Sequence, residues 1–380
     1  MAMHLTDLAR TAMAEWRAQD LLRTPGIFSS AQHPVATIDG RDYVLFSSSN
    51  YLSLAAHPAV IAAATAATEE FGAGSGGSRL TTGSTTWHRR AEAEFAQFVG
   101  SEDAVLFATG YQANLSTIAT IGALTEDLVI FSDSLNHASI IDGCRISRTP
   151  LKVFPHRDMA ALEDLLAART TDHALVITDG LFSMDGDIAP LPELLRLCQD
   201  HGAWLMVDDA HAVGTLGDHG RGTAEYFGCA LPDILIGTAS KALGAEGGFV
   251  CCSSEIAGLL RNRARSYVFS TAAPASSAAA ISSALTLVAE ALPALRRNVA
   301  HLCQLLNLPV SPSPIIPIPV GDEAEAMKHS AALKEQGLWV PAIRYPTVPR
   351  GAAILRVTVM AEHTPEHIEQ LARALATSGQ

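Results

Sequence analysis

The sequence predicts an α/β fold in which a large domain, built on a doubly wound and mostly parallel sheet, precedes a small α+β domain. From about Ala104 onward, short apolar runs alternate with segments of helical spacing, which is the pattern of strands buried on both faces and joined by helices. After about Pro274 the alternation gives way to Ala/Leu-rich stretches and a short mixed tail. We therefore expect an N-terminal helix and arm at 1–45, a large domain at 46–285 and a small domain at 286–380.

The expected elements follow in order along the chain. The first 19 residues have the spacing of an amphipathic helix. Seven apolar runs of strand length lie in the large domain, at 104–108, 127–131, 151–154, 173–178, 203–207, 233–237 and 248–252. Helical spacing lies between them at 113–124, 159–168 and 192–202, and the Ala/Leu-rich stretches are expected as two helices that reach about Asn307. In the tail, strands are expected at 313–320 and 352–359, and helices at 323–336 and from Pro365.

Composition and charge exclude several classes of protein. Of all residues, 48% are hydrophobic and only 17% are charged, so the chain is globular. The net charge of -13 and the lack of a basic block argue against nucleic acid, but a small anionic ligand held by local arginines stays possible. No apolar run looks long enough to span a membrane, and the first residues, which include Asp and Glu, do not form a secretory signal.

The cysteines point to a reducing compartment. All six are scattered along the chain and none forms a C-x-x-C pair. We therefore expect buried, reduced thiols in a cytoplasmic protein, rather than disulfides or a metal site.

Two neighbouring strand ends carry chemically useful side chains. Asp208, Asp209 and His211 come directly after the strand at 203–207, and ligands of a doubly wound sheet bind beyond such ends. Alone, these residues could form an ordinary polar turn. Lys241 follows the next expected strand; as a solvated loop lysine it would be inert, but burial would lower its pKa and make it a nucleophile toward carbonyls. An imine-forming lysine and an acid that holds a protonated pyridine nitrogen are the two parts of a pyridoxal phosphate site.

Two strand-to-helix junctions add to this hypothesis. Gly110 and Tyr111 lie where a helix is expected to begin, and the free N–H groups of a helix start suit a phosphate. The segment matches neither the G-x-G-x-x-G nor the Walker pattern, so a dinucleotide has little support. His137 lies at a second junction, where it could stack on a cofactor ring. A lone histidine in such a place is usually structural, so His137 counts only together with the other residues.

The order of motifs along the chain resembles a known family, the α-oxoamine synthases. The segments that carry the resemblance are "SSSNYLSLAAHP", "GGSRLTTG", "GYQAN", "NHASIIDG", "FSMDGDIAPL", "VDDAHAVGTLGDHGRG", "TASKALG" and "FST". The resemblance extends from Asn50 to the end of the chain, although general aminotransferases share the Asp and the Lys. It implies a fold-type-I pyridoxal phosphate enzyme, which condenses an amino acid with an acyl thioester and releases carbon dioxide.

The resemblance implies a role for each residue at the strand ends. Lys241 matches the lysine that joins the cofactor and takes the substrate Cα proton. Asp208 matches the partner of the pyridine nitrogen and His211 the donor to the phenolic oxygen, while Asp209 stands where the family usually has Glu. His137 matches the histidine that stacks on the ring and polarises the acyl carbonyl. The other positions that match cofactor contacts are Gly110, Tyr111, Ser183 and Thr238.

Four arginines are candidates for substrate binding. Arg356 lies in the middle of an apolar strand, where an unpaired cation would be costly. An ion pair with an internal acid would satisfy it, but the resemblance implies that it binds the carboxylate of the amino acid through two hydrogen bonds. Arg344 is a weaker candidate for the acyl end. Arg23 and Arg79 are weaker still, because both could be solvated surface residues.

The resemblance also implies the partners. In this family the residues that match Asn50, Ser270 and Thr271 reach the cofactor and substrate of the neighbouring subunit, so a homodimer with shared active sites is expected. The substrates implied are an amino acid and an acyl group carried by CoA or by a carrier protein. Neither a nucleic acid nor a membrane is expected as a partner.

Several members of the family stay open as models for the reaction. The short N-terminus and "PTVPRG" favour the biotin-pathway members that join L-alanine to a pimeloyl thioester, and they argue against mitochondrial aminolevulinate and membrane-bound sphingolipid relatives. "LNHASIIDGCR" and "DDAHAVG" are also similar to glycine C-acetyltransferases, the 2-amino-3-ketobutyrate CoA ligases. A secondary-metabolite synthase is a further alternative. A protein that binds pyridoxal phosphate without catalysis is the alternative from a different class, although no DNA-binding module of a regulator precedes Asn50.

Overall fold

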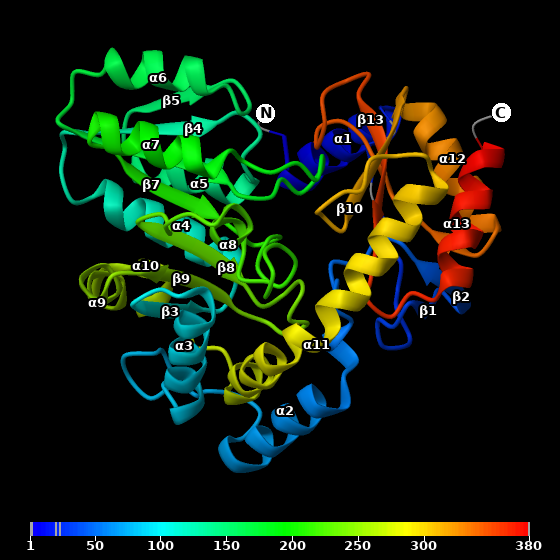
Figure 1. Cartoon of the computed structure of the whole chain (residues 1–380), viewed down its shortest axis with the longest axis horizontal. Coiled ribbons are helices and arrows are strands. Elements are labelled where there is room, and N and C mark those ends of the chain that lie inside the picture. The colour runs from blue at the N-terminus through cyan, green and yellow to red at the C-terminus, as the bar shows by residue number, and fades with distance from the viewer. Residues whose placement is uncertain (1–2, 20, 23, 379–380) are drawn as a thin grey trace.

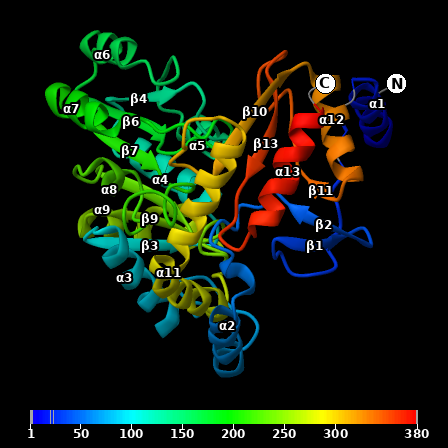
Figure 2. The ribbon, with the colours of Figure 1, turned by 45° about the vertical axis from the view of Figure 1, so that its right-hand side comes forward.

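The computed structural model describes residues 3–19, 21–22 and 24–378. Figure 1 and Figure 2 show a large part built around one wide sheet, beside a smaller part that holds two narrow sheets. The long helix α11 (Ala275–Leu305) runs from the large part into the smaller one. The predicted fold class, a doubly wound α/β domain with a small α+β domain, is confirmed.

The wide sheet has seven strands in the order β3-β9-β8-β7-β6-β4-β5. In chain order the strands are β3 (Asp103–Phe107), β4 (Leu128–Asp133), β5 (Leu151–Phe154), β6 (His173–Asp179), β7 (Trp204–Asp208), β8 (Ile234–Thr238) and β9 (Gly248–Cys252). β9 runs antiparallel to both β3 and β8, and the other neighbours are parallel. Each strand coincides with one of the seven apolar runs, because a strand buried on both faces needs apolar residues throughout; the edge strand β5 is the exception, since most of it is exposed.

Helices cover both faces of this sheet, as β4 illustrates. Leu128 and Ile130 pack into the core on one face, whereas Val129 and Phe131 pack into the core on the opposite face. The first core contains side chains from the helices α4 (Gly110–Gly122), α5 (Ala138–Ser147), α9 (Ser254–Arg263) and α10 (Arg265–Val268). The second contains side chains from α6 (Met159–Ala167), α7 (Leu191–His201) and α8 (Thr223–Phe227). Near β3 the second face is covered by α2 (Pro58–Phe71), α3 (Thr86–Val99) and α11.

Helix α11 corrects two expectations: that this stretch forms two helices, and that no apolar run is long enough to span a membrane. It is one helix of 31 residues, where two were expected, and Pro293 lies inside it without ending it. Buried Leu292 and Leu295 hold this stretch in the core, and such packing supplies most of the stability of a helix in a protein. By length and composition the helix could also cross a membrane, but 56% of its most apolar window is buried inside the protein. We therefore interpret it as a core helix.

The smaller part joins segments from both ends of the chain. One narrow sheet contains β10 (Ile315–Gly321), β13 (Ala353–Thr358) and β12 (Ala342–Ile343). The other contains β1 (Val35–Ile38), β2 (Arg41–Leu45) and β11 (Leu338–Trp339), and here β2 pairs with a strand almost 300 residues further along the chain. The tail helices are α12 (Glu323–Glu335) and α13 (Pro365–Ser378), as predicted. The expected N-terminal amphipathic helix is α1 (Leu5–Ala18), which buries none of its residues, and a short 3-10 turn, η1 (Leu54–Ala56), precedes α2.

Candidate active site

The strands β6, β7 and β8 end side by side and form one wall of a cavity. Asp179, the last residue of β6, is in register with Asp208, the last residue of β7, and Asp208 pairs in turn with Ile236 of β8. Parallel strands place their carboxyl ends at one edge, which is where doubly wound folds bind ligands. The cavity at this edge, which we call the strand-end cavity, has a volume of about 240 Å³. Its lining residues are Thr109, Gly110, Tyr111, Asn114, His137, Ser139, Asp179, Leu181, Ser183, Asp208, Ala210, His211, Thr238, Ser240 and Lys241.

Most of the predicted site residues meet here. Although they come from five separate segments of the chain, eight of them line the strand-end cavity: Lys241, Asp208, His211, His137, Gly110, Tyr111, Ser183 and Thr238.

Lys241 lies in a region that favours its neutral amine. Burial lowers the pKa of Lys241 to about 8, although the charges of Asp208 and Asp179 act in the opposite direction. The positive charge of Arg356 adds to the lowering. A pKa of about 8 leaves about a tenth of the amine unprotonated at pH 7, far more than in an ordinary lysine, and the unprotonated amine is the form that a nucleophile or general base requires.

Asp208 is held in place by two hydrogen-bond donors. Asn114 donates its side-chain N–H to Oδ2 at 2.6 Å, and the Ala210 amide donates to Oδ1 at 2.9 Å. Asn114 is fixed in turn by Ser139, to whose Oγ it donates at 2.9 Å. The sequence reasoning missed Asn114, although it lies four residues after Gly110 and therefore on the same face of a helix that starts there.

Burial keeps His211 neutral, and Tyr51 orients its ring. Burial lowers the pKa of His211 well below its ordinary value, and the charges of Lys241 and Arg356 lower it further. Burial also raises the pKa of Tyr51, whose hydroxyl lies 2.7 Å from Nδ1 of His211. The phenol therefore keeps its proton and can donate it to Nδ1, which leaves the ring proton on Nε2 for an acceptor in the cavity.

His137 caps a helix as well as lining the cavity. It is the N-cap of α5, and its Nδ1 accepts the Ser139 amide at 3.3 Å and lies 2.8 Å from Ser139 Oγ. Burial lowers the pKa of His137 and the charge of Lys241 lowers it further, against the opposing effect of Asp208. The ring is therefore neutral at neutral pH and fixed in orientation, as a stacking residue must be.

Asp179 is a second acid that the sequence reasoning missed. Burial and the charge of Asp208 raise the pKa of Asp179 well above its ordinary value. Within the part of the chain that the structure describes, Oδ1 of Asp179 and Oδ1 of Asn114 are buried without a hydrogen-bond partner. Unpaired buried polar atoms are costly, so both are consistent with a polar ligand in the cavity. The signal that predicted Asp208, an acid at a strand end, applies equally to Asp179.

Asp209 faces away from the cavity. It accepts hydrogen bonds from the amide of Thr223 at 2.8 Å and from the Thr223 hydroxyl, and burial raises its pKa to about 7. A Cβ atom on Gly180 would lie 1.9 Å from one of its carboxylate oxygens, and a Cβ on Gly222 would lie 2.3 Å from the other. This tight packing makes Asp209 an anchor for the loop that leads to α8.

The start of α4 offers donors to an anion. Thr109 is the N-cap, and its hydroxyl accepts the amide of Gln112 at 3.1 Å. The amides of Gly110 and Tyr111 belong to the first turn, where a helix provides no carbonyl for them and its dipole favours negative charge. On the opposite side Thr238 Oγ1 lies 2.9 Å from Ser240 Oγ and donates to the Gly247 carbonyl at 2.8 Å. Together these groups fit a phosphate.

Arg356 is a buried cation next to Ser183, one of the residues that line the cavity. Its Nε donates to the Ser183 carbonyl, and its backbone amide donates to the Pro341 carbonyl at 3.1 Å. Only 7% of the residue is exposed, yet no carboxylate among the described residues lies within ion-pair distance of it. The alternative of an internal acid as its partner is therefore wrong for the described part of the chain. A substrate carboxylate would supply the missing negative charge.

Two other candidates, Asn50 and Arg344, lie away from the strand-end cavity. Asn50 is buried, donates to the Gln32 carbonyl at 3.2 Å and accepts the Ala55 amide at 3.2 Å. Arg344 lines a separate pocket of about 570 Å³. Arg23 lies outside the described residues. The substrate contacts expected of Asn50, Arg344 and Arg23 stay predictions.

Ser270 and Thr271 also lie outside the strand-end cavity. Thr271 forms a β-bridge with Ser78, and the preceding Phe269 is 72% exposed. This segment therefore lies at the surface of the protomer. Its expected contact with the cofactor of a neighbouring subunit stays a prediction.

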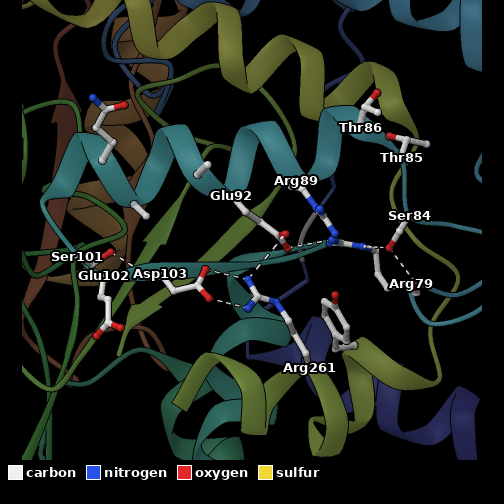
Figure 3. Close-up of a pocket in the computed structure, with 14 residues that line it drawn as sticks. Arg79, Ser84, Thr85, Thr86, Arg89, Glu92, Ser101, Glu102, Asp103 and Arg261 are labelled. Atoms are coloured by element: carbon white, nitrogen blue, oxygen red, sulfur yellow. Dashed lines mark hydrogen bonds and ion pairs between the residues drawn. The ribbon is translucent and has the colours of Figure 1, made fainter. Parts of the chain in front are cut away.

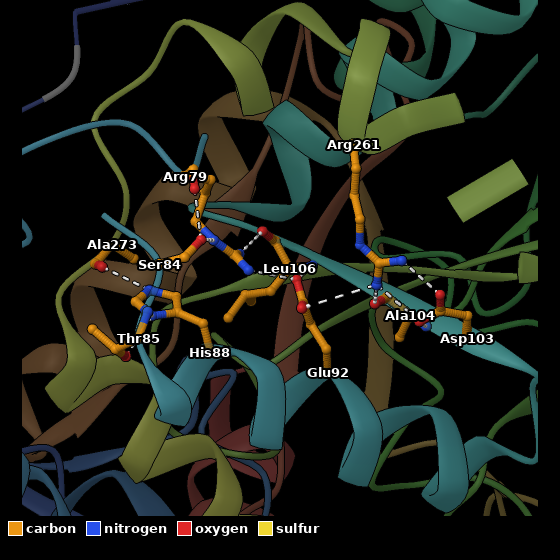
Figure 4. Close-up of polar contacts among 10 residues, drawn as sticks. All are labelled: Arg79, Ser84, Thr85, His88, Glu92, Asp103, Ala104, Leu106, Arg261 and Ala273. Atoms are coloured by element: carbon orange, nitrogen blue, oxygen red, sulfur yellow. Dashed lines mark hydrogen bonds and ion pairs between the residues drawn. The ribbon is translucent and has the colours of Figure 1, made fainter. Parts of the chain in front are cut away.

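Arg79 is not a solvated residue, so this interpretation of the sequence is wrong. Its buried guanidinium pairs with Glu92 of α3 at 2.9 Å and donates to the Leu106 carbonyl at 3.0 Å. Glu92 lies between Arg79 and Arg261, which donates two hydrogen bonds to Asp103 at 2.6 and 2.8 Å (Figure 4). These side chains line a pocket of about 850 Å³ (Figure 3). Because its guanidinium N–H groups donate to partners inside the protein, Arg79 has a structural role.

Comparison with known proteins agrees with this geometry. A family model described as aminotransferase class I and II matches residues 41–375. An 8-amino-7-oxononanoate synthase of Bordetella petrii is 45% identical over 389 residues, which cover 98% of both chains. The biotin biosynthesis bifunctional protein BioWF of Corynebacterium kroppenstedtii is 46% identical over 99% of this chain, which spans only 58% of that longer relative. A high-resolution structure of SPT with PLP superposes with a TM-score of 0.93 at 31% identity, over 99% of this chain and 98% of the other.

Proposed function

Because the chain belongs to the α-oxoamine synthases, within the aminotransferase class I and II family, we propose that it condenses L-alanine with a pimeloyl thioester. The products are 8-amino-7-oxononanoate, carbon dioxide and the free thiol. One observation carries the proposal: the buried amine of Lys241 and the carboxylate of Asp208 line a single cavity, and the buried cation of Arg356 donates to the carbonyl of Ser183, another residue of its lining. The choice of L-alanine and a pimeloyl thioester follows the Bordetella petrii relative, whose length the chain matches.

The cofactor is pyridoxal phosphate, and the residues of the strand-end cavity fit it. When bound, it supplies an aldehyde that joins amines and a ring that stabilises negative charge at Cα. Lys241 would hold the aldehyde carbon, Asp208 the pyridine nitrogen and His211 the phenolic oxygen. The phosphate would lie against the first amides of α4 and the hydroxyls of Thr238 and Ser240. His137 would cover one face of the ring.

The side chains in and beside the cavity then have separate roles in the reaction. Arg356 binds the carboxylate of L-alanine, while the Ser183 carbonyl holds the guanidinium in place. Nζ of Lys241, with a pKa of about 8, takes the Cα proton and returns a proton to the product after decarboxylation. His137 donates a hydrogen bond to the acyl carbonyl. Asp208, fixed by Asn114, keeps a proton on the pyridine nitrogen throughout.

We also propose that the protein works in the cytoplasm as a homodimer with shared active sites. All six cysteines are free thiols, as in a reducing compartment. Ser270 and Thr271 lie at the surface outside their own cavity, which leaves them available to a second copy. The acyl group arrives on CoA or on a carrier protein, and the amino acid and the thioester are the small-molecule partners.

A product assay tests the proposed function. The purified protein with pyridoxal phosphate is incubated with L-alanine, glycine or L-serine, each against pimeloyl-, acetyl- and palmitoyl-CoA, and the products are identified by mass. We expect 8-amino-7-oxononanoate and carbon dioxide from L-alanine and pimeloyl-CoA, and no product from Lys241→Ala. A product from glycine and acetyl-CoA, or from L-serine and palmitoyl-CoA, in place of this one would contradict the proposed substrates.

A further inference from the structure

A short hairpin links the cavity to the smaller part of the protein. Residues 180–189 turn back on themselves through a β-bridge between Leu181 and Ile188. The Phe182 amide donates to the Asp187 carbonyl at 3.0 Å, and the Ala189 amide closes the base by donating to the Gly180 carbonyl at 2.9 Å. The hairpin is therefore held together by its own backbone hydrogen bonds.

This hairpin contacts the smaller part at two points. The Ser183 carbonyl accepts the hydrogen bond from Nε of Arg356 on β13. Gly186 lies so close to β10 that a Cβ atom would be 2.4 Å from the Ile315 carbonyl oxygen, and its φ of +68° also favours glycine. The position of the hairpin therefore determines the position of the Ser183 carbonyl, which accepts the hydrogen bond from Arg356.

One histidine joins the hairpin to the sheet. Nδ1 of His156, in the turn after β5, lies 3.0 Å from Oδ1 of Asp133, the last residue of β4. Nε2 of the same ring lies 2.8 Å from Oδ2 of Asp187 in the hairpin. The ring packs edge-on against Phe182, with centroids 4.4 Å apart. A neutral imidazole has one N–H and can serve only one of these carboxylates, whereas an imidazolium serves both.

The charges around the ring favour the imidazolium. Burial acts to lower the pKa of His156, but the hydrogen bonds and charges of Asp133 and Asp187 outweigh it and raise the pKa. The charged groups that face the ring are Asp133 of β4, Asp185 and Asp187 of the hairpin, and Arg157 of its own turn. Arg157 pairs with Asp187 at 2.8 Å, and its amide donates to Asp133 at 2.9 Å, so it assists the same connection.

We propose that protonated His156 is a positioning residue, which fastens the 180–189 hairpin to the end of β4 and so presents the Ser183 carbonyl to Arg356. The effect on catalysis rests on the proposed function, since it concerns binding of the amino-acid carboxylate. The connection itself is independent of which reaction the protein catalyses.

Raising the pH weakens this connection. Because the pKa of His156 is higher in the folded protein than in the unfolded chain, the connection contributes fully below the ordinary histidine pKa of about 6.5. Its contribution is lost as the pH rises through the higher, folded-state pKa. Binding of the amino acid should therefore weaken toward alkaline pH through loss of the Ser183–Arg356 contact.

Hydrogen exchange tests the connection without measuring activity. In the protein with bound pyridoxal phosphate, amides of the 180–189 hairpin in His156→Gln should exchange about tenfold faster near neutral pH, as expected from the loss of a hydrogen bond to a charged group. His173→Gln is the matched control, because His173 is exposed and lies at the opposite end of β6. Equal exchange of the hairpin in His156→Gln and the unaltered protein would overturn the proposal.

Steady-state kinetics test the positioning role. In His156→Gln we expect the KM for L-alanine to rise about tenfold, while kcat and the KM for the thioester stay within about twofold. The alkaline fall in kcat/KM for L-alanine should disappear. Asp187→Asn, which keeps the shape of the carboxylate, should act in the same direction and serves if His156→Gln does not fold. The positioning role would be refuted if the KM for L-alanine were unchanged in both variants, or if every kinetic constant worsened in parallel. If the unaltered protein showed no turnover, only the proposed function would be refuted.

Discussion

Asp179 and Asp208 face each other in register across β6 and β7, but their surroundings differ. Donors reach both oxygens of Asp208, whereas Oδ1 of Asp179 has no partner among the residues that the structure describes. Burial and the neighbouring charge raise the pKa of Asp179 well above its ordinary value. One strand end therefore has an acid with donors on both oxygens, and the next has an acid with an unpaired oxygen and a raised pKa.

The two acids should respond differently to the same substitution. Asn resembles a protonated Asp, so Asp179→Asn should leave kcat/KM within about threefold of the unaltered protein. Asp208→Asn removes the charge opposite the cofactor nitrogen and should lower kcat by about 100-fold or more. Both are measured at saturating pyridoxal phosphate. An equally large loss in Asp179→Asn would mean that Asp179 works as a carboxylate.

Lys241 should titrate far below an ordinary lysine. In cofactor-free protein, acetic anhydride should label its amine with a pH midpoint of about 8. Asp208→Asn should move the midpoint lower, because the charge of Asp208 raises the pKa of Lys241. Mass spectrometry of the Lys241 peptide measures the labelling, with exposed Lys328 as an internal reference. A midpoint near the ordinary value of about 10.4 would contradict the burial argument.

Arg356 should act on one substrate only. Lys cannot bind both carboxylate oxygens and the Ser183 carbonyl together, so Arg356→Lys should lower kcat/KM for L-alanine by about 100-fold. The KM for the thioester should change little. Arg350→Lys, at an exposed position nearby in sequence, is the matched control for the loss of an arginine. Equal effects of Arg356→Lys on both substrates would argue for a general structural role.

Asp209 should make folding stability depend on pH. Its pKa is about 7 in the folded protein and about 3.9 in the unfolded chain, so its contribution is full below pH 3.9 and is lost as the pH rises through 7. The loss amounts to at most about 4 kcal/mol. Asp209→Asn does not titrate, so the stability of the unaltered protein relative to this variant should fall between about pH 4 and pH 7. Urea unfolding at each pH measures the difference, and a constant difference would contradict the burial of an ionisable Asp209.

Mixed dimers should reveal whether Thr271 acts on the neighbouring subunit. Lys241→Ala and Thr271→Ala protomers, each weakly active alone, are unfolded, mixed in equal amounts and refolded. If the sites are shared, every mixed dimer has one site without either change, so about a quarter of the full activity should return. If Thr271 acts within its own chain, no mixed dimer has an intact site. Mixing without recovery, with dimers shown by gel filtration, would therefore contradict the shared site.

The local pattern of the chain predicted the large sheet and much of the candidate site. A strand buried on both faces has to be apolar along its whole length, so the seven strands were visible as apolar runs. Polar residues that end such runs must lie at the edge of the sheet, and for this reason Asp208 and Lys241 were predicted as site residues. Asp179 ends β6 in the same manner, but a single acid between an apolar run and a glycine resembles many ordinary turns. Its raised pKa depends on burial and on Asp208, which no local window contains.

Other features needed the folded chain because they join distant segments. β2 pairs with β11, Arg79 is buried against Glu92 and Leu106, and His156 lies between Asp133 and Asp187. By itself the sequence determined the seven strands of the large sheet, several of the helices between them and the side chains at the ends of these strands, because those properties follow from the period of apolar residues. Only the tertiary structure decided which of these side chains are buried, paired or left without a partner, because desolvation and electrostatic interactions depend on neighbours that packing brings together.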